Sequence, residues 1–242
     1  MAQQLVSQRE SKMSQVYGRG CQIAGCTLPR KSGKKYCNKH EHGFHLKGDP
    51  MQVSIKISSL QRSTQEIQEL FESNKINPSL HDLKLALGER WMILGKSVEK
   101  YLNQQADGLA GVKGQRKGYQ AIQSLLKNVP MEEVLLLWAS FQRFEDSTPG
   151  IFVNQRSYKH QLVKHVRRIS HYVDPALINK RTGKPIVKYV PEMSVPEVNT
   201  VYDLLNQVFG VSGYQFSKAI SKRKDSKDEL DKRMRTALLG IT

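Results

Sequence analysis

Three cysteines and one histidine within the first 40 residues have the types and the spacing of a metal site. They follow the pattern Cys21-x4-Cys26-x10-Cys37-x2-His40. Two close ligand pairs on turns can converge on one tetrahedral Zn2+ ion, which prefers thiolate sulfur and imidazole nitrogen as ligands. Because four protein ligands leave no open position for water, the pattern predicts one structural zinc ion rather than a catalytic one.

Other interpretations of this segment are less favoured. His42 and His45 are alternative fourth ligands, but the x2 spacing after Cys37 favours His40. An iron–sulfur cluster fits poorly with a histidine ligand here. Unrelated buried thiols need apolar surroundings, whereas residues 17–50 are rich in glycine, lysine and histidine. Three cysteines cannot all pair with one another, so metal is favoured over disulfides.

The end of this segment resembles a known module. Cys37-Asn38-Lys39-His40 is followed, eight residues after the histidine, by Gly48-Asp49-Pro50. On these residues, about 21–50 is similar to the small zinc-finger module of phage HNH homing endonucleases and related phage DNA-binding proteins. The resemblance implies a compact zinc knuckle that assists DNA binding in a phage-related protein. It does not extend to the rest of the chain.

The positive charge is unevenly distributed. The chain has 242 residues, 38 Lys and Arg, 22 Asp and Glu, and a formal net charge of +16. Residues 1–50 carry nine basic and three acidic side chains, residues 51–150 carry twelve and eleven, and residues 151–242 carry seventeen and eight. A neutral centre between two basic ends indicates two polyanion-binding surfaces, with nucleic acid as the first candidate partner.

Membrane association is not expected. The basic segments lack the apolar opposite face of an interfacial helix, and no apolar run approaches the ~18 residues of a membrane span. The N-terminus has no apolar stretch of the kind found in secretory signals. We therefore expect a soluble intracellular protein, in the host cytoplasm if it is phage-encoded.

The hydrophobic periodicity predicts a mainly α-helical protein. We expect a flexible tail over 1–16, a zinc-binding module over 17–50, a neutral helical domain over 51–150 and a basic helix–hairpin–helix region over 151–242. Helices are predicted over 79–104, 119–127, 131–144 and 154–172, a β-hairpin over 176–190, and two further helices separated at Gly210 and Gly213.

The basic C-terminal region has two interpretations. A basic helix followed by a hairpin is what a winged-helix DNA reader needs. A helix packed by its apolar stripe, with a hairpin that merely connects, fits equally well. Aromatic residues make up only 7% of the chain, which favours duplex DNA over single strands or RNA. The candidate nucleic-acid contacts are Lys31, Lys34, Lys35, Lys39, Lys47, Lys159, Lys164, Arg167, Arg168, Arg181, Lys184, Lys218, Lys222, Arg223 and Lys224.

Signals of catalysis are weak. The sequence has no phosphate-binding loop and no nucleophile elbow, and the zinc assignment leaves no free thiol. An HNH nuclease would need a histidine base beside a metal held in a hairpin that precedes a helix. His160, His165 and His171 lack acidic partners at ligand spacing, so we interpret them as polar, phosphate-contacting positions.

These features together predict a zinc-containing, non-enzymatic DNA-binding protein. Its role would be that of a phage-type regulator or a replication or transcription accessory factor, with a possible protein partner such as RNA polymerase. Two alternatives remain open. One is a divergent HNH-like nuclease, and the other is an inhibitor or adaptor that binds an acidic protein partner.

Overall fold

The computed structural model describes residues 20–31, 33–106, 114–170 and 192–239. Within these ranges the chain is mainly helical, which confirms the predicted fold class at this level. The β-type pairing there consists of two isolated bridges, Gly20 with Pro29 and Arg30 with Cys37. The hairpin predicted over 176–190 lies outside the described residues.

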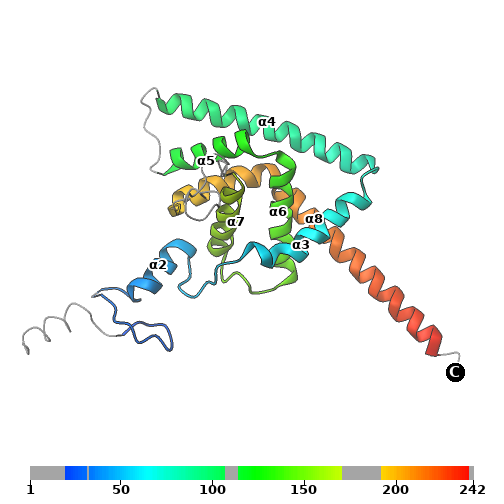
Figure 1. The fold of residues 1–242 in the computed structure, drawn as a ribbon, viewed down its shortest axis with the longest axis horizontal. Helices are drawn as coiled ribbons and strands as arrows, with labels where there is room; N and C mark the ends of the chain where they lie inside the picture. The colour runs from blue at the N-terminus through cyan, green and yellow to red at the C-terminus, as the bar shows by residue number, and fades with distance from the viewer. Residues whose placement is uncertain (1–19, 32, 107–113, 171–191, 240–242) are drawn as a thin grey trace, which may run out of the picture. The chain divides into compact units, whose positions relative to one another are not determined.

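The helical elements form the order shown in Figure 1. They are α2 (Asn38–Lys47), the short 3-10 helix η1 (Ile57–Leu60), α3 (Gln61–Ser73), α4 (Pro78–Ala106), α5 (Gln115–Asn128), α6 (Met131–Ser147), α7 (Gln155–Ile169) and α8 (Val195–Leu239). The described chain divides into two compact units. Unit 1 comprises residues 20–54 and 152–160, and unit 2 comprises residues 55–151 and 161–239, with the gaps given above.

The core of unit 2 forms where α6 packs against α8 and α3. Val134 and Phe141 of α6 and Phe209 of α8 are almost completely buried. Trp138 of α6 stacks on Tyr202 of α8 with 5.4 Å between ring centroids. The apolar run of α6 is therefore a core segment, as its sequence indicates. The neutral middle of the sequence and much of its basic C-terminal part thus share one unit, whereas the sequence suggested separate regions.

The last helix differs from its prediction. A break was expected at Gly210 and Gly213, but α8 continues without interruption from Val195 to Leu239. A glycine inside a helix costs about 1 kcal/mol relative to alanine without ending the helix. At Gly213 the missing side chain leaves room for a neighbour, since an added Cβ would lie 2.7 Å from Cδ1 of Trp138. The glycine marks a close helix–helix contact rather than a turn.

Two glycine substitutions should change the free energy of unfolding in opposite directions. Gly213→Ala should lower the free energy of unfolding by about 1–3 kcal/mol, because the new methyl group overlaps Trp138. Gly88→Ala in α4 should raise it by about 0.5–1 kcal/mol, because a Cβ there meets nothing within 4 Å. Urea midpoints of the two variants test this pair. Equal midpoints would contradict the packing assigned to Gly213.

Helix α7 is more deeply buried than its sequence suggested. In its second half, Gln161 and His165 are 0% and 1% exposed. The Gln161 side chain accepts the N–H of Ile55 at 3.2 Å, and His165 Nε2 lies 3.0 Å from the Ile55 carbonyl oxygen. These two polar side chains satisfy the backbone groups of a buried residue. The packed-helix interpretation of α7 is favoured over insertion into a DNA groove.

The sequence predicted that His160 and His165 contact phosphates, and their burial corrects this prediction. His160 is 4% exposed and His165 is 1% exposed. Burial lowers the pKa of His165, and the nearby charges of Arg168 and Lys164 lower it further, although the hydrogen bond to Ile55 acts in the opposite direction. Such side chains cannot reach a phosphate or a scissile bond, and His171 lies outside the described residues.

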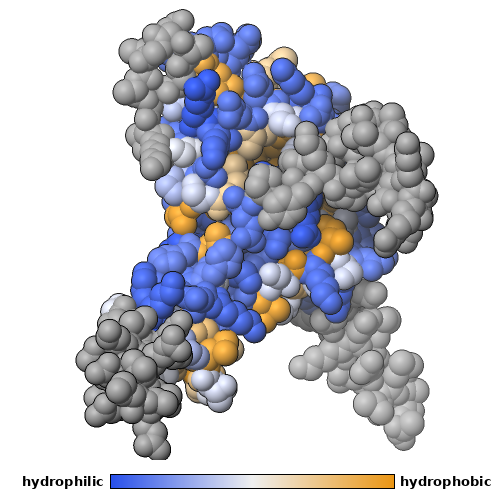
Figure 2. Space-filling view, turned by 60° about the vertical axis from the view of Figure 1, so that its left-hand side comes forward, coloured by the Kyte–Doolittle hydropathy of each residue, from blue (hydrophilic) through white to orange (hydrophobic). Residues whose placement is uncertain are grey.

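One face of the described residues is largely polar (Figure 2). Figure 2 shows a mostly hydrophilic face interrupted by small apolar patches. Among the described helices, none combines the length and the apolar character that crossing a bilayer requires.

Candidate metal centre

The four predicted ligands come together in unit 1. One ligand atom from each of Cys21, Cys26, Cys37 and His40 lies within 4.8 Å of all the others. The shortest separations are 3.3 Å from Cys21 Sγ to His40 Nδ1, 3.4 Å from Cys37 Sγ to the same nitrogen, and 3.9 Å between the sulfurs of Cys26 and Cys37. Ligands around tetrahedral Zn2+ are about 3.5–3.8 Å apart, given Zn–S and Zn–N bonds of about 2.3 and 2.0 Å. The cluster can therefore hold a metal ion, as predicted.

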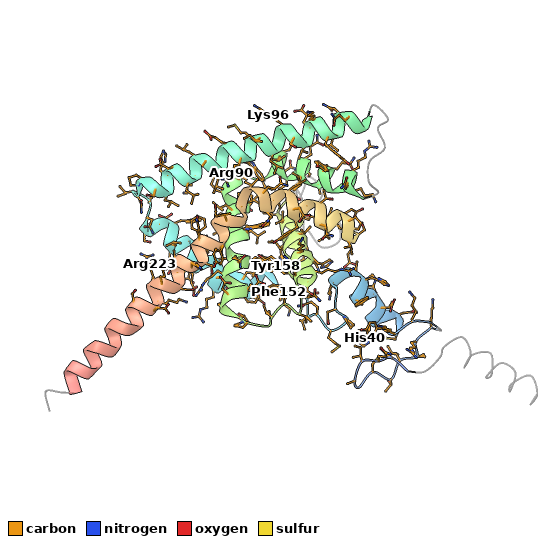
Figure 3. All side chains as sticks on the ribbon, turned by 180° about the vertical axis from the view of Figure 1, so that it is seen from behind. His40, Arg90, Lys96, Phe152, Tyr158 and Arg223 are labelled. Carbon is orange, nitrogen blue, oxygen red and sulfur yellow. The ribbon has the colours of Figure 1, made fainter. Side chains whose placement is uncertain are left out.

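The choice among the three nearby histidines follows from this geometry. His40, in the first turn of α2, belongs to the cluster (Figure 3). His42 is exposed, and Nε2 of His45 lies 2.9 Å from Oε1 of Glu41. Among the described residues, His40 is thus the histidine that completes the four-ligand set.

The surroundings of the cysteine thiols shift their pKa values, and a bound cation would stabilise their ionised forms. Burial by itself would raise the pKa of Cys21, but hydrogen bonds from the backbone N–H groups of Cys37 and Ile23, and from His40, lower it to about 6. For Cys26, a backbone hydrogen bond at Leu28 acts to lower the pKa, but partial burial and the other two cysteines outweigh it and raise the value. Three sulfurs this close repel one another once ionised, and a bound cation removes that repulsion.

Short backbone contacts position the first ligand pair. The N–H of Cys21 bonds the carbonyl of Leu28 at 3.3 Å, and the N–H of Cys26 bonds the carbonyl of Ile23 at 3.0 Å. Gly25 between them has a φ of 75°, in the left-handed region that glycine tolerates. A tight turn therefore directs Cys21 and Cys26 toward one point without help from a hydrophobic core.

The second ligand pair lies at the start of α2. Cys37 occupies the N-cap position and His40 the first turn. The residues of α2 have no apolar period, and the structure shows why, since α2 contains no buried side chain. A helix of ten residues is marginal by itself in water. Its stability must come from its two ends.

The C-terminal end of α2 is capped by residues far away in the sequence. Gly48 has a φ of 76° and donates its N–H to the Phe44 carbonyl at 2.9 Å. Ser157 Oγ donates to the Lys47 carbonyl at 2.6 Å, Asn154 Nδ2 donates to the Gly48 carbonyl at 3.1 Å, and the Arg156 guanidinium donates to the His45 carbonyl. All of these residues belong to unit 1. Three of the four carbonyl groups that the end of α2 leaves unpaired, those of Phe44, His45 and Lys47, thereby receive a hydrogen bond.

The Gly48-Asp49-Pro50 sequence has a local structural role. A Cβ on Gly48 would lie 2.8 Å from Cδ of Arg156, so glycine is required both for its φ and for this close approach. Asp49 Oδ1 accepts the N–H of Met51 at 2.7 Å and closes the following turn. The motif thus ends α2 and leaves room for Arg156.

The three residues at the start of α7 that cap α2 were not predicted from the sequence. Asn154, Arg156 and Ser157 were not among the candidate site residues. The sequence carried a signal only for the start of α7, because Asn is a favoured N-cap residue and Asn154 Oδ1 accepts the backbone N–H of Ser157 at 2.9 Å. The partner helix, however, could not be identified from that pattern.

Unit 1 is strongly basic. Its described residues include eight Lys and Arg but only two acidic residues, Glu41 and Asp49. Glu41 lies 3.2 Å from Lys34 and 2.9 Å from His45, and the hydrogen bond from Lys34 is the main cause of its lowered pKa. Asp49 accepts the Met51 N–H. Both carboxylates are therefore engaged within the unit.

The candidate nucleic-acid contacts of unit 1 are mostly exposed. Lys31, Lys34, Lys35 and Lys39 are exposed around the metal ligands. Lys47 is partly buried and donates to the Gln52 carbonyl at 3.1 Å, and Lys159 is also partly buried. The four lysines between Cys26 and His40, here called the zinc-loop lysines after the predicted ion, are thus exposed to solvent.

The candidate nucleic-acid contacts of unit 2 differ in how far they are exposed to solvent. Lys218, Lys222, Arg223 and Arg168 are exposed, whereas Lys164 and Arg167 are partly buried. Lys224 lies 2.6 Å from Glu66, and Arg223 donates to Ser73 Oγ at 3.0 Å. Arg181 and Lys184 lie outside the described residues. Part of the basic charge on α8 is therefore used within the fold.

Comparison with known proteins does not assign this chain to a family. No protein-family model, curated protein or solved structure is significantly similar to this chain. The functional conclusion must come from the site itself.

Proposed function

We propose that this protein is a zinc-containing, non-enzymatic DNA-binding protein, acting as a phage-type regulator or as a replication or transcription accessory factor. The observation that carries the proposal is the charge of unit 1, in which exposed lysines lie between the metal ligands in the sequence and both carboxylates are engaged. Neutralising several phosphates releases counterions, which supplies sequence-independent affinity for nucleic acid.

Zinc is the ion that suits this ligand set. Three cysteine sulfurs and one imidazole nitrogen are soft and intermediate donors, which suit zinc rather than magnesium or calcium. Four protein ligands fill a tetrahedral shell, so the ion would be structural. Its role would be to hold the Cys21–Cys26 turn against the start of α2 and thereby fix where the lysines lie.

An enzymatic role has less support. A histidine base must come within hydrogen-bond reach of its substrate, and His160 and His165 are buried. The adaptor alternative, in which the basic surface meets an acidic protein, uses the same charges. It differs in predicting weak binding to naked DNA.

Salt dependence tests the proposal directly. Binding to a fluorescein-labelled DNA duplex should weaken linearly on a plot of log K against log salt, with a slope that implies several phosphate contacts. Lys35→Ala and Lys39→Ala should each reduce the magnitude of the slope by about 0.9. Lys96→Ala is the matched control, because Lys96 is exposed on α4 in unit 2 (Figure 3).

The outcome separates the alternatives. A steep slope that the two zinc-loop variants reduce and the control does not would support DNA binding through unit 1. No binding to the duplex at low salt, together with a stoichiometric complex with an acidic protein, would favour the adaptor role instead.

A further inference from the structure

Helix α2 is fixed at both ends but buries none of its own side chains. Its N-cap residue Cys37 and His40 of its first turn belong to the metal cluster, and its C-terminal end is capped by Asn154, Arg156 and Ser157. It therefore adds no side chain to a hydrophobic core. An ordered helix that presents its side chains to solvent in this way is suited to contact a partner.

The exposed side of α2 carries hydrogen-bonding groups in a row. Asn38 and His42 are four residues apart, so they lie on the same side of the helix, and both are exposed. Lys39, also exposed, follows Asn38 at the flank of this row. An asparagine amide offers both a donor and an acceptor, and a neutral imidazole offers one of each.

The charges around this row match a polyanion. Glu41, the acidic residue of α2, lies between Lys34 and His45 and is held by both. Asp49, the other described carboxylate of unit 1, is bonded to the Met51 N–H. Lys31, Lys35 and Lys39 are exposed nearby in the sequence. A phosphate backbone that approaches α2 would therefore meet cations rather than free carboxylates.

From this combination we infer that α2 is a recognition helix that enters the major groove of duplex DNA and reads base edges through Asn38 and His42. The inference rests on the proposed DNA-binding function and adds sequence readout to it. The groove, about 12 Å wide, admits an α-helix, and a helix of ten residues is about 15 Å long. In helix-turn-helix proteins, residues near the N-terminal end of the recognition helix make the base contacts, and Asn38 holds such a position here.

The chemistry of the two side chains sets the expected readout. Asparagine forms a bidentate pair with N6 and N7 of adenine. His42 can donate one hydrogen bond to N7 of a purine. The lysines contact phosphates, which position the helix but carry no sequence information. Asn38 and His42 would thus determine specificity, and the lysines would determine affinity.

Selection from a randomised DNA duplex library tests this division of roles. The zinc-loaded wild-type protein should enrich a short motif that contains an adenine. Asn38→Ala should reduce discrimination at that base pair by about 5- to 150-fold while leaving the slope of log K against log salt unchanged. His42→Ala should remove preference at a neighbouring base pair. Zinc content, measured for each variant, shows that the metal site is intact.

Two controls complete the design. His81→Ala replaces an exposed histidine of α4, in unit 2, and should leave the motif unchanged. Lys39→Ala should weaken binding equally for all sequences. Salt-dependent binding of the wild type with no enriched motif would overturn the recognition-helix inference and leave the proposed function standing. Failure to bind any duplex would overturn both.

Discussion

Cys26→Ser is expected to abolish zinc binding and to unfold α2 while leaving the helices of unit 2 in place. Cys26 lies in the loop before α2 and takes no part in that helix, so its effect on α2 must be transmitted through the ion. Zinc binding contributes about 10–16 kcal/mol to the folding of small zinc modules. Because α2 buries no side chain, we expect the hydrogen bonds that cap its C-terminal end to be insufficient to keep its ten residues helical once the ion is lost.

Two measurements check this result. The zinc content, measured by elemental analysis, should fall from about one ion per chain in the wild type to none in the variant. Amide hydrogen exchange should accelerate within α2 and remain slow in α6, which lies in the core of unit 2. His42→Ala is the matched control, since it removes a neighbouring histidine outside the ligand cluster. Slow exchange in α2 without bound metal would contradict the role given to the ion.

Glu66→Gln should produce the second large effect, a loss of about 3–5 kcal/mol in the stability of unit 2. Glu66 of α3 lies 2.7 Å from Arg143 of α6 and 2.6 Å from Lys224 of α8. Only 7% of the Arg143 side chain is exposed. The neutral amide would leave that guanidinium buried without a carboxylate, which costs much more than the loss of a surface ion pair.

The same carboxylate gives this stability a pH dependence. Burial by itself would raise the pKa of Glu66, but hydrogen bonds from Lys224 and Arg143, together with their charges, lower it below its ordinary value. The ionised carboxylate therefore contributes fully above its unfolded pKa of about 4.3. The contribution is lost as the pH falls from there through the lower folded pKa.

Urea denaturation at neutral and acidic pH measures both effects. The difference between wild type and Glu66→Gln should be large at pH 7 and should shrink as the pH falls below about 4. Glu69→Gln, an exposed position on the same helix, should change the free energy of unfolding by less than about 0.5 kcal/mol. A similar loss for both variants would show that Glu66 has no special role.

The metal cluster could be predicted because its information is local. Cysteine and histidine spacing alone indicated the ligand set, and turns within the same 20 residues bring the ligands together. The existence of α2 could not be predicted in the same way. Its residues have no apolar period, and its C-terminal caps come from α7, with Ser157 separated from Lys47 by 110 residues.

Long-range partners also explain the main errors in the predictions for α7 and α8. The polar pattern of α7 suggested a solvated face, but Gln161 and His165 bond the backbone of Ile55, which lies more than 100 residues earlier. Gly213 suggested a helix break, but its role is to leave room for Trp138, a residue of another helix. A single sequence shows which groups are polar or small, but not which distant groups they meet.

The capping of α2 by α7 also has a consequence for synthesis on the ribosome. The ligands Cys21 to His40 leave the exit tunnel well before Ser157, which follows Lys47 by 110 residues. At about 5–20 residues per second, this interval lasts about 5–20 s. During that time the far end of the helix still lacks its partners, so the four ligands would be able to bind an ion before the unit is complete.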